Sequence, residues 1–588
     1  MIPARRLAPL VAAAVLAGSL PALAASRPAV EGGRGMVVTA NARATEVGVK
    51  ILEAGGNAID AAVAVGYALA VVDPCCGNIG GGGFMTLRLA DGRELFLDFR
   101  ETAPRAASRD MYLDAAGEVV KDASLTGWRA SGVPGTVAGL DHALSRFGSL
   151  PRDRVMAPAI ALARDGFTLA RPDTDILARG TARLSRDPEA ARIFLSPEAR
   201  TLKPGDRLTQ PDLAATLEKI AATGPDAFYR GETAAKVETA MRAAGGTLTA
   251  ADFAAYRVNE TTPVTCTYRG HRLISAPPPS SGGTTVCLIL NVLEGFDLKA
   301  MGWHSAAAVK TWVEAMRHAF LDRNFLLGDP AFVKVPVDRL LSKDYAAAIR
   351  DRIRADGRIA SKSLAPGVAP HEKPETTHYS VVDAAGNAVA VTYTINGLFG
   401  AAVVAPGTGL LLNDEMDDFT VKPGVPNLFG LVQGEANAIS PGKRPLSSMS
   451  PTIVLKDGRL FLVLGSPGGS RIISIVAETI VNIVDFGMSP QEAVDAPRVH
   501  HQWLPDEVYF EPFGLSPDTL AILKTEGYVL KEQSPWGAAE LIVVAPAETT
   551  AGPASSGNDS ASSGAVLSGR LYGANDARRP AGAAAAPP

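Results

Sequence analysis

The sequence predicts an α+β or layered α/β protein in which helices flank two sheets. Long amphipathic helical patterns, broken by glycine and proline, occupy residues 35–345. Strand-like runs with glycine-containing turns dominate from residue 376 onward. Between them, residues 355–375 are polar and carry several prolines, which is typical of an exposed linker. A chain of 588 residues can bury a large core, but these patterns do not fix the order of the layers.

The first 24 residues predict a secretion signal. Arg5 and Arg6 form a short basic region, residues 7–20 are apolar, and residues 22–24 form a small-x-small cleavage motif. The apolar stretch is too short for a stable membrane anchor. The residues around the arginine pair favour ordinary secretion over twin-arginine export. We therefore expect a mature protein that is exported, periplasmic or secreted, and without a membrane anchor.

The predicted elements follow in chain order. Helices are expected at residues 42–53, 213–223 and 306–324, and as a buried apolar helix at residues 58–72. Strands are expected at residues 378–382, 388–394 and 409–412, and as a hairpin of residues 451–455 and 460–465 that turns at Asp457 and Gly458. Two more helices are expected at residues 471–485 and 490–496.

The C-terminal region contains a low-complexity insert. Residues 546–569 are rich in serine, glycine, alanine and threonine, and they separate the strand-like runs 540–544 and 570–572. This composition predicts a flexible hairpin tip. The last residues, 581–588, are expected to be disordered.

Charge and cysteine usage exclude several classes of protein. A net charge of −4 implies no basic face, so nucleic acid is not expected as a partner. Four cysteines in so long a chain do not make a disulfide scaffold, and without a CxxC motif neither zinc binding nor a redox role is expected. A Cys266–Cys287 bridge and buried free thiols both remain open. The adjacent Cys75 and Cys76 are hard to bridge without strain.

Thr376 lies where the linker meets the strand-rich region. Threonine is a poor nucleophile inside a chain. If the Glu375–Thr376 bond is cut, the freed α-amine, with a pKa near ~8, lies on the same residue as the hydroxyl and can take its proton. The alternative is a pair of β-branched residues that opens a strand, and the dipeptide alone favours that alternative.

Two loops carry candidate binding groups. The segment GSPGGS, residues 465–470, follows a strand and precedes a helix. Backbone N–H groups in such a turn can stabilise an oxyanion, although a plain strand-to-helix turn also explains it. Ser447 and Ser448 lie between prolines and offer two hydroxyls to a substrate carboxylate. An ordinary loop with serine capping is the alternative there.

Charged residues suggest a site for an amino acid. Arg100 ends a strand-like run, and a guanidinium binds a carboxylate in a bidentate manner, although a surface or salt-bridged arginine is the alternative. Residues 412–419, LNDEMDDF, carry four acids that repel one another unless solvent or a cation balances them. An ammonium-bearing substrate would supply that cation. Calcium and a solvated acidic loop are the other interpretations.

Together these segments closely resemble the gamma-glutamyltranspeptidase family over nearly the whole mature chain. The matching segments, in family order, are GGNAIDAA (55–62), GGGGFM (80–85), DFRE (98–101), PPPSSGG (277–283), TTHYS (376–380), RPLSSMSP (444–451), GSPGGS (465–470) and LYGA (571–574). The resemblance implies the N-terminal nucleophile hydrolase fold, an α+β four-layer αββα sandwich with two stacked antiparallel sheets flanked by helices. It also implies a precursor cut into a large subunit, residues 25–375, and a small subunit, residues 376–588, which stay together.

The resemblance also implies a role for each site residue. Thr376 corresponds to the cleavage point and nucleophile, Thr394 to the threonine that hydrogen-bonds it, and Gly468 and Gly469 to the oxyanion-hole glycines. The remaining correspondences are Arg100, Ser447 and Ser448 around the substrate α-carboxylate, and Asn396, Glu415 and Asp418 around its α-amino end.

The implied reaction moves a γ-glutamyl group from glutathione or a related compound to water, an amino acid or a dipeptide through a threonine ester, with no cofactor or metal. The lid loop, residues 422–430, carries Phe429 where many bacterial members have a tyrosine. Without that hydroxyl we expect a looser lid and a changed balance of hydrolysis over transfer. A cephalosporin or glutaryl acylase is the alternative function, but glutaryl groups lack the α-amino group that Asp418 would bind. A self-cleaved, non-catalytic binding protein is the other alternative.

Overall fold

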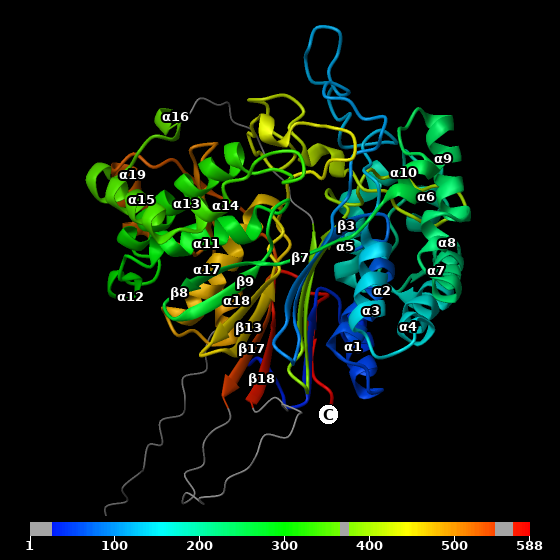
Figure 1. The fold of residues 1–588 in the computed structure, drawn as a ribbon, viewed down its shortest axis with the longest axis horizontal. Helices are drawn as coiled ribbons and strands as arrows, with labels where there is room; N and C mark the ends of the chain where they lie inside the picture. Colours follow the sequence, from blue (N-terminus) through cyan, green and yellow to red (C-terminus); the bar gives the residue numbers. More distant parts are fainter. Residues whose placement is uncertain (1–25, 365–375, 547–568) are drawn as a thin grey trace, which may run out of the picture.

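The computed structural model describes residues 26–364, 376–546 and 569–588, which form two stacked antiparallel sheets between two groups of helices (Figure 1). The first sheet runs β1 (Val30–Gly32), β18 (Gly569–Asn575), β17 (Glu540–Pro546), β13 (Arg459–Gly465), β12 (Thr452–Lys456), β9 (His271–Ser275), β8 (Val264–Tyr268). The second runs β19 (Ala583–Ala585), β2 (Gly35–Thr39), β10 (Thr377–Asp383), β11 (Ala388–Thr394), β3 (Gly82–Arg88), β4 (Glu94–Phe99), β7 (Asn259–Thr261). Small sheets pair β5 (Phe167–Thr168) with β6 (Arg207–Leu208), and β14 (Val499–His500) with β15 (Val508–Phe510) and β16 (Leu530–Glu532).

One helical layer lies on each outer side of the sheets (Figure 1). Beside the second sheet are α1 (Ala42–Glu53), α2 (Ala58–Val72), α3 (Thr136–Phe147), α4 (Arg152–Asp165), α5 (Arg171–Leu184), α6 (Pro188–Phe194), α7 (Pro211–Thr223), α8 (Asp226–Tyr229), α9 (Glu232–Ala244) and α10 (Ala250–Ala255). Beside the first are α11 (Gly282–Leu293), α12 (Leu298–Met301), α13 (Ala306–Leu326), α14 (Val337–Leu341), α15 (Lys343–Asp356), α16 (Ser361–Leu364), α17 (Ile472–Val484), α18 (Pro490–Asp495) and α19 (Pro517–Thr525).

Alternation along the strands builds the layers. In β2, Met36 and Val38 enter the core between the sheets, whereas Val37 enters the core beneath the α1–α2 layer. In β10, Val382 enters the core between the sheets and Val381 enters the core beneath the α1–α2 layer. Because successive strand side chains point to opposite faces, both faces of these strands are buried. The predicted four-layer αββα sandwich is confirmed.

The apolar run 58–72 forms helix α2, as predicted. Asn57 caps its first turn by accepting hydrogen bonds from the Ile59 and Asp60 N–H groups, and the Asp60 side chain accepts from the Asn57 N–H. Every residue of α2 is buried, in contact with β10 among other elements. Among the described residues, no helix is long and apolar enough to cross a bilayer.

The β10–β11 hairpin places the threonine of interest near the middle of the second sheet. Thr377 pairs with Tyr393 at the open end of the hairpin, so Thr376 and Thr394 face each other just beyond it. Gly465 ends β13 in the other sheet, and a Cβ there would lie 2.3 Å from the His378 ring. Only glycine fits such a close approach, which brings the turn after β13 up against β10.

Three expectations about secondary structure are wrong. The C-terminal residues are not disordered: β19 pairs with β2, with Ala583 opposite Thr39. Residues 409–412 form no strand and make only an isolated bridge from Leu411 to Val404. The polar stretch after residue 355 contains helix α16, in which Ser361 is buried and its N–H donates to Asp506 over 2.9 Å. Strand β19 is ordered by backbone pairing with β2, and α16 by a contact with the distant Asp506. Neither interaction can be recognised from the local sequence.

Both cysteine pairs form disulfides. Cys266–Cys287 links β8 to α11 with its Cα atoms 6.0 Å apart, which settles one open alternative. Cys75 and Cys76 are also bonded to each other, contrary to expectation. Their segment follows α2, where the Arg579 guanidinium contacts both sulfur atoms and the Asp73 carboxylate.

Some predicted features lie outside the described residues. These are the secretion signal, most of the linker with Glu375, and residues 547–568 of the low-complexity insert.

Candidate active site

One cavity collects nearly all of the predicted site residues. It is lined by Arg100, Arg323, Thr376, Thr394, Asn396, Glu415, Asp418, Phe429, Leu431, Ser447, Ser448, Met449, Gly469 and Ile472. Of the predicted set, only Gly468 is not part of the lining. The residues come from segments more than 350 positions apart, so the fold, and not local sequence, assembles them.

The two threonines lie at the open end of the β10–β11 hairpin. Thr376 is 3% exposed, and its Oγ lies 3.4 Å from the Thr394 Oγ. The Thr394 Oγ also accepts a 2.8 Å hydrogen bond from the Asn396 N–H. Either hydroxyl can be the donor in the contact between the two threonines. Asn396 has a φ of 72° and donates from its amide to the Asp414 carbonyl over 3.0 Å, so its side chain is fixed at the cavity wall.

The glycine turn approaches the same cavity from the other sheet. Gly468 and Gly469 have φ values of 142° and 55°, which side-chain-bearing residues rarely adopt. Gly469 lines the cavity and begins the short 3-10 turn that leads into α17. Backbone N–H groups at such a turn are free of helical partners. They are available to a developing oxyanion.

A buried guanidinium and its acids form the charged part of the cavity. Arg100 is fully buried, and its two terminal nitrogens pair with Glu415 and Asp418. Its Nε donates to the Pro445 carbonyl over 3.2 Å. Three of its N–H groups are thus used, and a guanidinium has five. Arg100 thus pairs with two of the four acids of segment 412–419, and the Arg183 Nη2 lies 3.9 Å from a third, Asp414.

Comparison with known proteins identifies the family. The gamma-glutamyltranspeptidase family model matches residues 44–583. The chain belongs to the gamma-glutamyltranspeptidase family. It is 53% identical over 561 residues to the glutathione hydrolase proenzyme of Pseudomonas sp. (strain A14), covering 95% of this chain and 96% of that protein. It is 48% identical over 581 residues to the glutathione hydrolase proenzyme of Escherichia coli (strain K12), covering 96% of each.

The fold comparison agrees. The crystal structure of cephalosporin acylase from Bacillus halodurans has a TM-score of 0.80 at 27% identity, covering 95% of this chain and 97% of that one. The crystal structure of Helicobacter pylori gamma-glutamyltranspeptidase has a TM-score of 0.54 at 44% identity, covering 55% of this chain and 93% of that one. The chain is an enzyme of the N-terminal nucleophile hydrolase type.

Sequence reasoning missed Glu101, which adds a third carboxyl group beside Arg100. Its Oε2 lies 3.5 Å from the Arg100 Nη1, and neither of its oxygens has a hydrogen-bond partner among the described residues. Burial raises the pKa of Glu101 to about 7, against the opposing effect of Arg100. Burial also raises the pKa of Glu415 well above its ordinary range. The nearby Glu101 charge adds to the raised pKa of Glu415.

Arg323 is the second residue that sequence reasoning missed. Its guanidinium donates to the Ser448 Oγ over 3.1 Å, to the Ser281 Oγ over 3.2 Å and to the Gln433 side chain over 2.9 Å. No carboxylate among the described residues lies within 4.0 Å of it. Burial lowers its pKa to about 10, so it remains a cation at neutral pH. It lies in a long helical pattern, which carries no signal that one arginine is turned inward.

The loop of residues 422–430 is held by hydrogen bonds of its main chain and of Asn427. Phe429 is 4% exposed, and its main-chain N–H and carbonyl bond Asn427 and Gln502 over 3.0 and 3.2 Å. The Asn427 amide donates to Asp418 over 3.4 Å, and the Leu428 N–H donates to Asp417 over 2.7 Å. The bonds of Asn427 and Leu428 tie this loop to the acidic segment 412–419.

Proposed function

We propose that this protein hydrolyses and transfers γ-glutamyl groups, with Thr376 as the nucleophile. One observation carries the proposal: Arg100, Glu415 and Asp418 lie together in the cavity that holds Thr376. A γ-glutamyl group carries its carboxylate and its ammonium on one carbon atom. A site for it must therefore present both signs of charge within a few ångströms, as this cluster does.

Maturation comes first in the proposed sequence. The Thr376 Oγ attacks the carbonyl of residue 375, and the C–N bond between residues 375 and 376 breaks as the acyl group moves from nitrogen to oxygen, which frees the α-amine of Thr376. Water then hydrolyses the ester, which frees the Thr376 hydroxyl and the carboxylate of residue 375. The products are a large subunit ending at Glu375 and a small subunit beginning at Thr376. The subunits remain associated because β10 and β11 of the small subunit pair with β2 and β3 of the large one.

The mature site then transfers the acyl group. The Thr376 Oγ attacks the γ-carbonyl of the donor while the α-amine takes the hydroxyl proton. Gly468 and Gly469 stabilise the oxyanion through their N–H groups, and Thr394 orients the nucleophile. The α-amine returns the proton to the leaving amine, which leaves a γ-glutamyl ester on Thr376. Water then releases glutamate, whereas an amino acid or dipeptide gives a new γ-glutamyl peptide.

In this proposal, separate groups bind the α-carboxylate and the α-ammonium of the donor. The unused N–H groups of Arg100, with the Ser447 and Ser448 hydroxyls, bind the α-carboxylate. Glu415, Asp418 and the Asn396 amide bind the α-ammonium. No metal or cofactor takes part in this scheme. Export through the predicted signal completes the proposal, which places the enzyme in the periplasm or outside the cell.

An acylase of the same fold is the second candidate, because the Bacillus halodurans cephalosporin acylase has a similar structure. Glutaryl groups carry no ammonium, so Asp418 would have no substrate charge to bind. Turnover of γ-glutamyl-p-nitroanilide beside glutaryl-p-nitroanilide separates the two. We expect at least a tenfold preference in kcat/KM for the γ-glutamyl compound, and equal or reversed preference would refute the proposal.

A further inference from the structure

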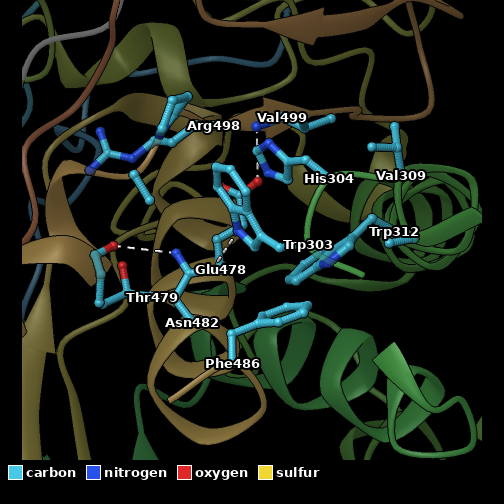
Figure 2. A pocket seen from close by; sticks show the side chains of 14 residues that line it. Trp303, His304, Val309, Trp312, Glu478, Thr479, Asn482, Phe486, Arg498 and Val499 are labelled. Atoms are coloured by element: carbon cyan, nitrogen blue, oxygen red, sulfur yellow. Dashed lines mark hydrogen bonds between the residues drawn. The ribbon is translucent and has the colours of Figure 1, made fainter. Parts of the chain in front are cut away.

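A second cavity lies among the helices beside the first sheet, apart from the Thr376 site (Figure 2). Helix α13 contributes Ala308, Val309 and Trp312, and α17 contributes Glu478, Thr479 and Asn482. The loop before α13 and the segments around α18 complete the wall. None of the lining residues belongs to the Thr376 cavity.

Four of the fourteen lining residues are aromatic: Trp303, His304, Trp312 and Phe486. Figure 2 shows the rings of Trp303, Trp312 and Phe486 around one space. Trp303 stacks on His304 with ring centroids 3.8 Å apart, and its Nε1 donates to Asn482 over 3.2 Å. Trp303 is 37% exposed whereas Trp312 is 8% exposed, so Trp303 is the more solvent-exposed of the two tryptophans that line the cavity.

Glu478 supplies the unpartnered polar group of this wall. Its Oε1 accepts the Val499 N–H over 2.9 Å, but its Oε2 has no hydrogen-bond partner among the described residues. The residue is only 9% exposed. The neighbouring Asn482 amide and Thr479 hydroxyl already donate to the Ala493 and Ile475 carbonyls. A buried carboxyl oxygen without a partner is unfavourable, so this atom points to a ligand.

The charges that face Glu478 do not neutralise it. Arg498 is paired with Asp576, and Glu511 is paired with Arg578. Burial raises the pKa of Glu478 to about 8, with Glu511 adding to the effect and Arg498 and Arg578 opposing it. Burial lowers the pKa of His304 to about 4. His304 is therefore neutral near pH 7 and offers Glu478 no cation.

We propose that this cavity binds the ammonium head group of a small alkylamine, held by the free oxygen of Glu478 beside the Trp303 and Trp312 rings. Aromatic rings attract cations through their negative faces, and a carboxylate supplies the opposite charge. A cavity volume of about 20 Å³ exceeds the roughly 10–15 Å³ that one water-sized group needs. A space of this size holds one small head group, so the proposed head group is a primary ammonium. The alkyl tail would extend from the cavity beside Trp303.

Binding must depend on pH. The ammonium binds the ionised carboxylate, so below pH 8 each binding event displaces a proton from Glu478. The apparent Kd is the intrinsic Kd divided by the ionised fraction. From the pKa of about 8, affinity rises about eightfold from pH 6.5 to 7.5 and about threefold from pH 7.5 to 8.5.

Isothermal titration calorimetry of the mature enzyme with n-butylammonium chloride tests this proposal, with 1-butanol as the uncharged match and sodium chloride as the ionic-strength control. We expect saturable binding of the amine with the stated pH trend. Proton release should be visible as a dependence of the heat on the buffer. If 1-butanol binds as tightly as the amine, or if the amine shows no saturation because water alone fills the cavity, the proposal fails.

Two glutamate variants complete the test. Glu478→Gln keeps the shape and an acceptor for the Val499 N–H but removes the charge, so we expect at least tenfold weaker amine binding without a pH trend. Glu532→Gln, an exposed residue of β16, should bind as the wild type does. Thermal unfolding checks that both variants fold. Should Glu478→Gln misfold, the amine-to-alcohol comparison and its pH trend in the wild type still decide the outcome.

Discussion

Asp418→Asn is the substitution that best separates the proposed donor site from a general acyl site. The Asp418 carboxylate pairs with Arg100 and accepts from Asn427, and the residue is 7% exposed. Asparagine keeps the size and one acceptor oxygen. It removes the negative charge that the proposal assigns to the donor α-ammonium.

The magnitude follows from the loss of one charged hydrogen bond. Such bonds contribute about 1.5–3 kcal/mol, which corresponds to roughly 10- to 150-fold in donor affinity. We therefore expect KM for γ-glutamyl-p-nitroanilide to rise by that factor, with a smaller change in kcat. Glutaryl-p-nitroanilide has no ammonium, so its kcat/KM should fall by less than threefold.

Initial rates of both anilides, measured on fully processed protein, give the answer. Asp417→Asn is the matched control, because Asp417 is a buried neighbour that bonds Ser124 and Leu428 and does not line the cavity. An equal loss for the two anilides in Asp418→Asn would refute the ammonium role. So would a similar selective loss in Asp417→Asn.

Three further substitutions probe the rest of the site. Thr394→Val removes the hydroxyl that lies 3.4 Å from the Thr376 Oγ, so kcat should fall roughly 2- to 13-fold, as expected for the loss of one neutral hydrogen bond of about 0.5–1.5 kcal/mol; an unchanged kcat in a rate assay would count against its role. Arg323→Gln removes the cation that bonds Ser448 and Ser281. Donor KM should rise about 5- to 30-fold with kcat less affected, a loss of about 1–2 kcal/mol, and Arg323→Lys should recover part of it. Phe429→Tyr adds a lid hydroxyl, so the ratio of transfer to hydrolysis, measured with glycylglycine as acceptor, should change; an identical ratio would dismiss the lid hypothesis.

Local patterns predicted much of the fold. Helix α1 and strand β11 begin and end where the periodicity predicts, at Ala42–Glu53 and Ala388–Thr394. The β12–β13 hairpin turns at Asp457 and Gly458 as expected. Such elements follow from the spacing of apolar residues and from the residue types in turns, and both can be read from a short stretch of sequence. Strand β19 contains only alanines and pairs with β2 through its backbone at a sheet edge. An alanine run has no alternation of polar and apolar residues, so the sequence does not predict this strand.

The candidate site was predictable for a different reason. The residues expected to bind the donor lie in short motifs at strand ends and turns, and the resemblance to the gamma-glutamyltranspeptidase family implies their roles from the sequence alone. The pairing of Arg100 with Glu415 and Asp418 was not foreseen, because residues 315 or more positions apart meet only in the fold. The sequence did not predict Arg323 and Glu101 as site residues for the same reason. Only the fold shows that both side chains are buried, Arg323 in the cavity wall and Glu101 beside Arg100.

Intact mass spectrometry of the purified wild type and Thr376→Ala tests the central claim most directly, because the nucleophile must also cut the chain. The wild type should give two fragments, the smaller beginning at Thr376, together with turnover of γ-glutamyl-p-nitroanilide. Thr376→Ala should remain one uncut chain without turnover. A Thr376→Ala protein that is cut normally, or an uncut wild type that turns over the donor, would contradict the claim.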